Sequence, residues 1–360
     1  MTNVLFTGFP GFIGARLLPR LLSLQPHARF QCLVQERFLP AAQAALREIE
    51  GTHPEARGRL ETVVGDITAP DLGIEPARAR ELQKGLAGAW HLAAVYDLAV
   101  TRAVGQRINV DGTRNVLDFL KGAPLLRRLH YISTCYVSGK TRGVFRETDL
   151  ERGQSFRNHY EETKYLAEVD VAKAGLPTTV YRPAIVVGDS RTGETGKFDG
   201  PYFTLAAMER LPARALFLRI GSGRAPANMV PVDFVVEAMA RLSSIEGSAG
   251  QTYQLVDPAP LSVYEVGKLM ASALGKKFAY VPTPLAVARA LFSPGPVQRY
   301  FGMPVQTLDY FAEQSQYDTT NASRDLGPLG VRCPALPDYM DRLVAFYLQK
   351  RGQVRKEAMV

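Results

Sequence analysis

The sequence is poor in cysteine and has no long hydrophobic run. Its 360 residues include 3 cysteines (Cys32, Cys135 and Cys333), without a CxxC pair or a Cys/His cluster at metal-ligand spacing. Disulfide-rich secreted folds and zinc sites both need such clusters, so we expect neither, and a chain suited to the reducing cytoplasm. No stretch of about 18 apolar residues occurs, and the N-terminal segment lacks the features of a secretory signal. We therefore expect a protein that is neither secreted nor membrane-spanning.

An excess of positive charge is present instead. Lysine and arginine number 43 against 35 acidic residues, a formal net charge of +8. Such a balance favours anionic partners: phosphorylated cofactors, coenzyme A, acidic carrier proteins or anionic lipid, rather than nucleic acid. One apolar segment, 281–294, predicts either a short core-facing helix or a peripheral membrane contact. The oligomeric state, monomer or dimer, stays open.

The first half of the chain alternates short β-branched runs with longer amphipathic segments, which predicts an α/β fold with a Rossmann-type, doubly wound parallel sheet. Strands are expected at 3–7, 29–34, 60–66, 88–94, 128–134 and 178–183, and helices at 15–24, 41–50, 77–84, 105–120 and 160–174. The rhythm breaks after Val187, although 229–242 and 251–257 look strand-like again. We therefore expect a nucleotide-binding domain over 1–187, with 229–257 returning to it, and a smaller substrate-binding lobe from 188–228 and 258–360.

A glycine-rich loop follows the first expected strand and leads into the first helix. It reads Gly8-Phe9-Pro10-Gly11-Phe12-Ile13-Gly14. Glycines at this spacing bring backbone N–H groups against a pyrophosphate, and the helix N-terminus adds partial positive charge. Three glycines can also simply make a tight turn, but the strand before and the helix after favour a dinucleotide site.

Other expected cofactor contacts lie at the ends of later strands. Asp66, followed by Ile67, could accept a hydrogen bond from the adenine amino group, or could instead cap a helix. Small Ala93 and Ala94 leave room for the cofactor.

The end of the second expected strand bears on the type of cofactor. Gln35 stands where NAD-selective folds usually carry an acid, and Arg37 suits a 2′-phosphate, with Arg16 as a second candidate. NADPH is therefore favoured, whereas Glu36 keeps NADH as the alternative. Both arginines are also compatible with plain surface positions.

Tyr160 and Lys164 are the candidate catalytic pair. Their i, i+4 spacing places them on one helix face, where the ammonium should favour the phenolate and move its pKa toward neutrality. Thr134 ends the fifth expected strand, at the edge where a doubly wound sheet faces its cofactor, and could donate to the same substrate oxygen. The alternative is a solvated helix face. Neighbouring Cys135 is expected to be a packing residue.

These motifs together resemble the extended short-chain dehydrogenases/reductases. GFPGFIG, GDIT, HLAA, INVDGTRNVL, YISTCYVSG, YEETK and YRPAIVVG occur in the family's order over most of 1–260. The resemblance implies that Thr134, Tyr160 and Lys164 are catalytic and that Asn109 is structural. It also implies that Pro183, Ile185 and Val186 lie beside the nicotinamide.

Two further stretches, 181–202 and 316–334, are similar to the thioester-reductase and fatty-acyl-CoA-reductase branch of that family. This branch implies NADPH and an acyl thioester on coenzyme A or an acyl carrier protein, reduced to an aldehyde and sometimes onward to an alcohol. The sequence shows no adenylation or carrier segment, so we expect the thioester to arrive from solution.

Other functions fit the same scaffold. A ketone or alcohol dehydrogenase, acting on 3-oxoacyl or steroid-like substrates, stays open. A sugar-nucleotide epimerase or dehydratase is disfavoured by Gln35. A non-catalytic dinucleotide-binding regulator would be expected to lose Tyr160 or Lys164, and this chain keeps both.

Overall fold

A parallel sheet forms the centre of the protein, in a computed structural model that describes residues 2–196, 198–301, 305–312 and 314–351. The sheet is 7-stranded, in the order β11-β7-β5-β4-β1-β2-β3, and each neighbouring pair is parallel. The strands are β1 (Thr2–Thr7), β2 (Ala28–Val34), β3 (Leu60–Val64), β4 (Leu86–His91), β5 (Arg128–Ile132), β7 (Thr178–Pro183) and β11 (Thr252–Leu255). The strand order reverses between β1 and β4, where doubly wound sheets bind a dinucleotide. The predicted fold class is confirmed.

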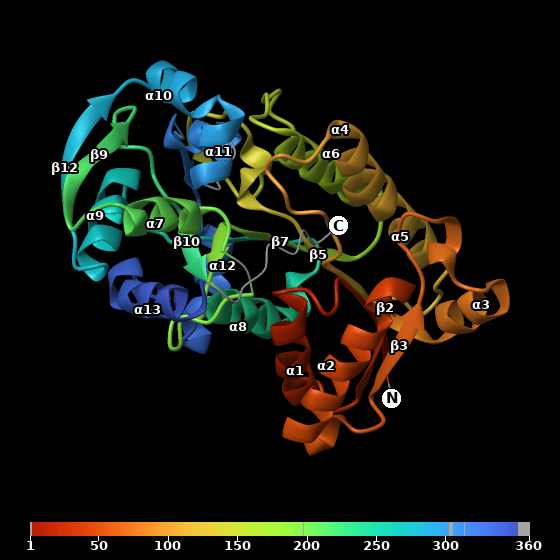
Figure 1. Cartoon of the computed structure of the whole chain (residues 1–360). Helices are drawn as coiled ribbons and strands as arrows, with labels where there is room; N and C mark the ends of the chain where they lie inside the picture. Colours follow the sequence, from red (N-terminus) through yellow and green to blue (C-terminus); the bar gives the residue numbers. More distant parts are fainter. Residues whose placement is uncertain (1, 197, 302–304, 313, 352–360) are drawn as a thin grey trace.

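Helices cover both faces of the sheet (Figure 1). Leu17 of α1 and Met239 of α8 lie in one buried apolar cluster, whereas Leu82 of α3 and Val116 of α5 lie in another. The flanking helices are α1 (Gly14–Leu24), α2 (Leu39–Thr52), α3 (Pro76–Gly85), α5 (Gly112–Lys121), α6 (His159–Lys173) and α8 (Val232–Ser243). Parallel strands need apolar cover on both sides, which explains why they are so rich in valine, leucine and phenylalanine.

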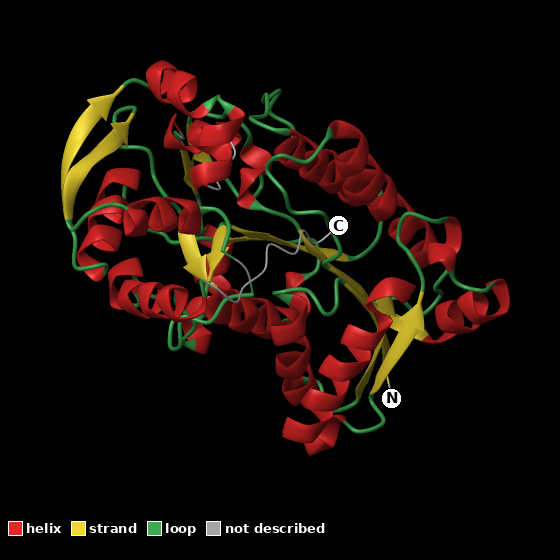
Figure 2. Ribbon diagram, viewed as in Figure 1, coloured by secondary structure: helices red, strands yellow, loops and turns green. Residues whose placement is uncertain are grey.

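A smaller lobe lies beside the sheet and has its own apolar cluster, which includes Tyr202, Met270 and Leu343. Figure 2 shows a separate two-stranded sheet at its outer edge, made by β9 and β12. The elements of this part are α7 (Pro201–Arg210), β9 (Arg214–Ile220), α9 (Val263–Ala273), β12 (Lys277–Thr283), α10 (Leu285–Phe292), α11 (Gly295–Phe301) and α13 (Met340–Lys350).

Short elements connect the two parts. β6 (Gly143–Phe145) pairs with β13 (Ser315–Tyr317), and β8 (Ile185–Val187) pairs with β10 (Met229–Pro231). Other short elements are α4 (Arg102–Gly105), a π-helical segment (Gln106–Asp111), α12 (Thr320–Leu326) and 3₁₀ turns at Glu36–Phe38, Pro54–Ala56, Pro70–Gly73, Cys135–Ser138, Glu246–Ser248, Val305–Ala312, Gly327–Leu329 and Leu336–Asp338. β6 lies within 1–187 and β13 lies beyond 258, so this strand pair joins the two expected domains. The division into these domains stays a prediction.

The prediction for 229–242 was wrong over most of its length. Only Met229–Pro231 is a strand, and it pairs with β8 rather than with the central sheet. The following residues form α8, which is buried on nearly every side. A continuous apolar run does not distinguish a buried strand from a buried helix. In contrast, the strand expected at 251–257 is confirmed as β11, at the edge of the sheet beside β7.

The apolar segment 281–294 contains the end of β12 and all of α10. Leu285, Ala288 and Phe292 pack into a small apolar cluster, whereas Val287 and Leu291 are exposed. One side of α10 therefore faces the core. Contact of its exposed side with a membrane stays a prediction. Within the described ranges, no helix is both long and apolar enough to cross a membrane.

Candidate active site

The glycine-rich loop turns sharply between β1 and α1. Gly8 has φ +85°, and a Cβ there would lie 2.8 Å from the backbone nitrogen of Ala93. A Cβ on Gly14 would lie 2.6 Å from the Gly8 carbonyl oxygen. Both positions therefore exclude a side chain for local packing reasons, and the loop runs close to the end of β4.

The N-terminus of α1 suits a bound pyrophosphate. Its first residue follows Ile13, which supplies no side-chain cap, and its first turn contains no acidic residue. The Ala15 and Leu17 backbone nitrogens donate to the Gly11 and Ile13 carbonyls, so the helix start favours an anion mainly through its partial positive charge. Binding of a dinucleotide diphosphate by the loop from Gly8 to Gly14 stays a prediction.

Gln35 lies between two charged neighbours at the end of β2. Its amide nitrogen donates to Asp66 at 2.9 Å, and its oxygen accepts from Arg37 at 2.9 Å. Asp66 also accepts from the Thr68 backbone nitrogen at 2.8 Å, so it closes a local turn rather than capping a helix. Arg37 is exposed, whereas Arg16 forms an ion pair with Glu194 at 2.8 Å. Contact of either arginine with a cofactor phosphate stays a prediction.

Thr134 and Tyr160 are brought together from the end of β5 and the start of α6. Thr134 follows β5 by two residues, and its side chain lies near enough to the Tyr160 phenol to lower the pKa of that phenol. Tyr160 is the second residue of α6, which Asn158 caps by accepting from the Glu161 backbone nitrogen at 3.0 Å. The Tyr96 ring meets the Tyr160 ring edge-on, with the ring centres 5.1 Å apart. That the Thr134 and Tyr160 hydroxyls act on one substrate oxygen stays a prediction.

Lys164 lies one turn further along α6 and is fully enclosed. Its ammonium donates to the Ile132 carbonyl at 2.8 Å and to the Tyr131 hydroxyl at 3.2 Å. An ammonium has three N–H donors, so these contacts leave one for another partner. The lysine is held in place by β5, and no hydrogen bond between it and Tyr160 is found among the described residues.

The predicted lowering of the Tyr160 pKa was wrong for this state of the chain. Burial raises that pKa well above its usual value, and the nearby Thr134 side chain offsets this only in part. The phenol is therefore neutral at physiological pH, which is the form that can donate a proton. Burial also lowers the pKa of Lys164, to about 8, against an opposing effect of Glu168.

A buried set of contacts extends from Lys164 into the central sheet. The Tyr131 ring lies 5.7 Å from the His91 ring, centre to centre, and His91 Nε2 lies 3.1 Å from the Thr113 hydroxyl. His91 Nδ1 lies 2.8 Å from the Thr7 hydroxyl. Burial lowers the pKa of His91 to about 3, so this imidazole is neutral. These contacts tie Lys164 to three parallel strands. Sequence analysis missed them because the residues lie on different strands at no fixed spacing.

A second buried network lies on the other side of α6. Glu168 accepts from Arg182 Nε at 2.9 Å and from the Ser133 hydroxyl, next to Thr134. The side chains of Glu168 and Arg182 are each 2% exposed. Removing one partner of such a pair leaves an uncompensated buried charge, so the network fixes α6 against β5 and β7.

Asn109 occupies the π-helical segment before α5. Its side chain accepts from the Val95 backbone nitrogen at 2.9 Å and donates to the Thr163 hydroxyl at 3.1 Å. It therefore joins the loop after β4 to α6 between Tyr160 and Lys164. This placement agrees with the structural role that the resemblance implied.

The other expected cofactor residues lie at carboxyl ends of the central strands. Ala93 donates its backbone N–H to the Thr7 hydroxyl at 3.2 Å, and Ala94 is exposed. The Ile67 carbonyl accepts from Asn115 at 2.8 Å. Pro183 ends β7, and Ile185 and Val186 belong to β8. The contacts of all these residues with a cofactor stay predictions.

No cluster of metal-ligating side chains occurs in the part of the chain that the structure describes. Cys135 and Cys32 are buried free thiols, and Cys333 is partly buried. Burial raises the pKa of the Cys333 thiol to about 12, which suppresses its reactivity.

Comparison with known proteins agrees with this geometry. A family model described as "Male sterility protein" matches residues 6–239. A linear gramicidin synthase from Brevibacillus parabrevis is 30% identical over 271 residues, 71% of this chain and 5% of that protein. Fatty acyl-CoA reductase wat of Drosophila melanogaster is 24% identical over 273 residues, 66% of this chain and 53% of that protein. The chain thus spans well under two thirds of either relative.

Solved structures with a similar fold include both a reductase domain and a sugar-nucleotide epimerase. The terminal R domain from the myxalamid PKS-NRPS biosynthetic pathway has a TM-score of 0.81 and 25% identity, with 97% of this chain and 91% of that chain covered. UDP-glucuronic acid 4-epimerase from Bacillus cereus, 16% identical with a TM-score of 0.67 over 99% of this chain and 100% of that chain, shares the fold. The resemblance to reductases of the extended short-chain family is confirmed. Because the matched model covers most of the chain, the protein belongs to the male sterility protein family of NAD(P)-binding extended short-chain dehydrogenases/reductases.

Proposed function

We propose that this protein is an NADPH-dependent reductase of acyl thioesters, carried on coenzyme A or on an acyl carrier protein, with an aldehyde as the first product. One observation carries the proposal: the Thr134 and Tyr160 side chains lie close together beside an enclosed Lys164, on a fold similar to the myxalamid terminal R domain. A fatty acyl-CoA reductase among the relatives supports the same substrate class.

Thr134 and Tyr160 have separate roles in the proposed reaction. Thr134 and Tyr160 hold the acyl oxygen and stabilise the negative charge that grows on it during the reaction. A bound nicotinamide supplies the hydride that reaches the acyl carbon. Tyr160 donates its proton to the oxygen, which gives a hemithioacetal. Breaking the C–S bond then releases aldehyde and thiol, so one hydride and one proton are consumed for each aldehyde formed.

Lys164 acts on position and charge. Two of its N–H groups are held by Ile132 and Tyr131, which leaves the third for the cofactor ribose. Its ammonium would also stabilise the tyrosinate that remains after proton donation. Thiol release from a long-chain acyl-CoA in the presence of NADPH tests the proposal. Absence of thiol and of NADPH oxidation with every acyl thioester offered would contradict it.

The preference for NADPH rests on Arg37. Its guanidinium is exposed at the end of β2 and contacts neutral Gln35, not an acid that would bind ribose hydroxyls. Replacing Arg37 with serine should lower kcat/KM for NADPH by roughly tenfold, since a charge-assisted hydrogen bond is lost, and should leave NADH nearly unaffected. Equal effects on both cofactors would favour a plain surface role for Arg37.

A ketone or alcohol dehydrogenase is the second candidate, because the same three residues serve any carbonyl. Oxidation of a secondary alcohol with NADP⁺, at a rate above that of thioester reduction, would favour it. The similarity to a sugar-nucleotide epimerase reaches 16% identity and concerns the fold alone.

A further inference from the structure

A small cavity opens beside the first turn of α6 and is lined largely by cations. It has a volume of about 260 Å³, and its charged lining consists of Lys140, Arg142, Arg157, Arg289 and one acid, Asp309. We call it the cationic cavity. Ligand sites for drug-sized molecules span roughly 300–1,000 Å³, so this volume suits a single compact group rather than a whole ligand.

The cationic cavity has a buried wall and an exposed rim. The side chain of Arg157 is 5% exposed, and it donates to the Gly139 carbonyl at 2.6 Å and to Glu161 at 3.4 Å. Lys140 and Arg142 are exposed at the rim. Between described residues, no hydrogen bond or ion pair engages their side chains. The rim therefore offers positive charge that no acidic side chain of the described residues pairs with.

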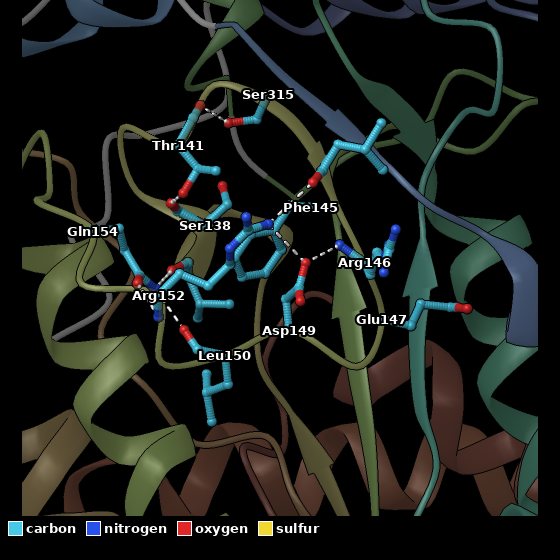
Figure 3. Close-up of polar contacts among 12 residues, drawn as sticks. Ser138, Thr141, Phe145, Arg146, Glu147, Asp149, Leu150, Arg152, Gln154 and Ser315 are labelled. Atoms are coloured by element: carbon cyan, nitrogen blue, oxygen red, sulfur yellow. Dashed lines mark hydrogen bonds and ion pairs between the residues drawn. The ribbon is translucent and has the colours of Figure 1, made fainter.

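The backbone that carries the rim is held from both sides. The Lys140 backbone nitrogen donates to the Ser155 carbonyl at 2.8 Å. Figure 3 shows Thr141 linked to Ser138 and Ser315: its hydroxyl donates to the Ser138 carbonyl at 2.6 Å, and its carbonyl accepts from Ser315 at 2.8 Å. Such a fixed backbone lowers the entropic cost of placing Lys140 and Arg142 around an anion.

The cationic cavity shares its supporting elements with the catalytic residues. Arg157 directly precedes Asn158, the cap of α6, and Tyr160 is the second residue of that helix. Thr134 begins the 3₁₀ turn that leads to Gly139 and Lys140. A long flexible arm could thus place its reacting end at Tyr160 and its other end at these cations.

An adjoining cavity of about 910 Å³ shares Arg142 and Gln314 but differs in charge, because Asp257 and Asp318 also line it. The excess of positive charge is therefore confined to the smaller space. A phosphate group is compact, doubly or singly anionic, and binds several guanidinium and ammonium donors at once.

Building on the proposed thioester substrate, we propose that the cationic cavity binds the phosphate of a phosphopantetheine arm, with Lys140 and Arg142 as its main ligands. Coenzyme A and a carrier protein both present this phosphate next to the same pantetheine. The assignment concerns recognition of the arm and adds no chemical step.

The decisive comparison uses one acyl group on two thiols, pantetheine and 4′-phosphopantetheine, which differ by the phosphate alone. We expect kcat/KM to be roughly tenfold higher for the phosphorylated substrate at low ionic strength, with the difference falling as salt is added. The variant Lys140→Gln/Arg142→Gln should lose most of this ratio. Arg142→Lys, which keeps the charge, should retain much of it.

A matched control removes two exposed cations elsewhere. Arg80→Gln/Lys84→Gln changes the net charge equally on α3 and should keep the full ratio. An equal loss in this control, or a wild-type ratio near one, would overturn the phosphate site. Reduction of acyl-pantetheine without any preference for phosphate would leave the reductase proposal standing and reject the site alone.

Direct binding gives a second measurement that does not need turnover. Calorimetric titration with 4′-phosphopantetheine should show binding that pantetheine lacks and that Lys140→Gln/Arg142→Gln loses; absence of any difference would reject the site. Parallel assays with acyl-CoA and with the same acyl group on a carrier protein then show the source of the phosphate. The substrate whose kcat/KM falls in Lys140→Gln/Arg142→Gln is the one that supplies the recognised phosphate.

Discussion

Lys164 and the cations of the cationic cavity differ in their exposure and in their partners. Lys164 is 4% exposed, and its neighbours Ile132 and Tyr131 accept two of its three N–H groups. Lys140 and Arg142 are exposed and have no such partners within the described ranges. A buried, partnered cation acts with a fixed direction, whereas an exposed one attracts anions and is screened by salt. The catalytic region should thus be sensitive to shape and pH, and the cavity to ionic strength.

The largest expected effect concerns proton donation. Tyr160→Phe removes the proton donor but keeps the ring that packs on Tyr96. We expect kcat to fall by roughly 10²–10⁴-fold at unchanged cofactor affinity, because general acid catalysis contributes about that factor. Single-turnover rates and NADPH fluorescence titration measure the two quantities. Unchanged turnover would remove Tyr160 from the mechanism and revive a binding role for this fold.

Cofactor binding should depend steeply on Gly8. A Cβ in Gly8→Ala would collide with the Ala93 backbone nitrogen at 2.8 Å, and the positive φ disfavours any side chain. We expect a loss of unfolding free energy of about 1–3 kcal/mol and much weaker NADPH binding. Denaturant unfolding and fluorescence titration report on each. Gly143→Ala is a useful control, since it also has positive φ but no atom within 4 Å of the added Cβ.

The pH dependence should follow Lys164. Because burial lowers its pKa to about 8, the ammonium is lost as pH rises through 8, and kcat/KM should fall there. The free energy of unfolding should instead increase with pH. The cost of burying the ammonium is fully present below pH 8 and disappears as the pH approaches 10.5, the pKa of lysine in the unfolded chain. In Lys164→Arg the charge persists, so residual activity should lack the alkaline decline. A flat wild-type profile from about pH 7 to 9.5 would contradict this role, because that range brackets the lowered pKa.

A smaller effect should follow from removing one of the contacts behind the lysine. Tyr131→Phe removes the hydroxyl that accepts from Lys164 at 3.2 Å and leaves the ring in place. One hydrogen bond contributes about 0.5–1.5 kcal/mol, so we expect a two- to tenfold rise in KM for NADPH and an altered alkaline limb. Tyr181→Phe is the matched control, because its hydroxyl bonds His130 at 3.0 Å in the same sheet, away from Lys164. Equal kinetic effects in both variants would indicate general loosening of the sheet.

The smallest expected effect concerns α10. Val287 and Leu291 are 48% and 52% exposed, so Val287→Ser/Leu291→Ser should change stability by no more than about 0.5 kcal/mol per residue. If this face contacts membranes, wild-type protein should sediment with anionic vesicles and the variant should not. Absence of the wild-type protein from the vesicle pellet would reject membrane contact.

Local patterns predicted the nucleotide-binding part well. The loop from Gly8 to Gly14 and the Tyr160/Lys164 spacing are consecutive or nearly so in the chain, and each has a fixed geometry once its strand or helix forms. For the same reason the alternation predicted strands β1 to β5 and β7, whereas β6 was not predicted. The prediction for 229–242 failed because most residues of α8 are buried and its polar face is narrow, made by Asp233, Glu237 and Arg241.

Contacts between distant segments could not be predicted. Tyr131, Thr113 and His91 approach one another only after three strands and α5 have packed. The direction of the Tyr160 pKa shift was also wrong in the sequence-based interpretation, because burial outweighs the effect of Thr134, which lowers that pKa, and burial depends on the whole fold. The cationic cavity likewise joins 140–157 to 285–314, which share no motif.

The pairing of β6 with β13 determines which parts of the protein can fold early during its synthesis. The contact between Thr141 and Ser315 spans 174 residues, and Glu147 likewise accepts from the Ala322 backbone nitrogen at 3.2 Å. During synthesis the glycine loop and the first strands emerge early and can fold locally. The segment that carries Lys140 and Arg142 gains its last supports only when residues beyond 315 have left the ribosome. A nascent chain should therefore acquire NADPH affinity well before it can recognise a phosphorylated arm.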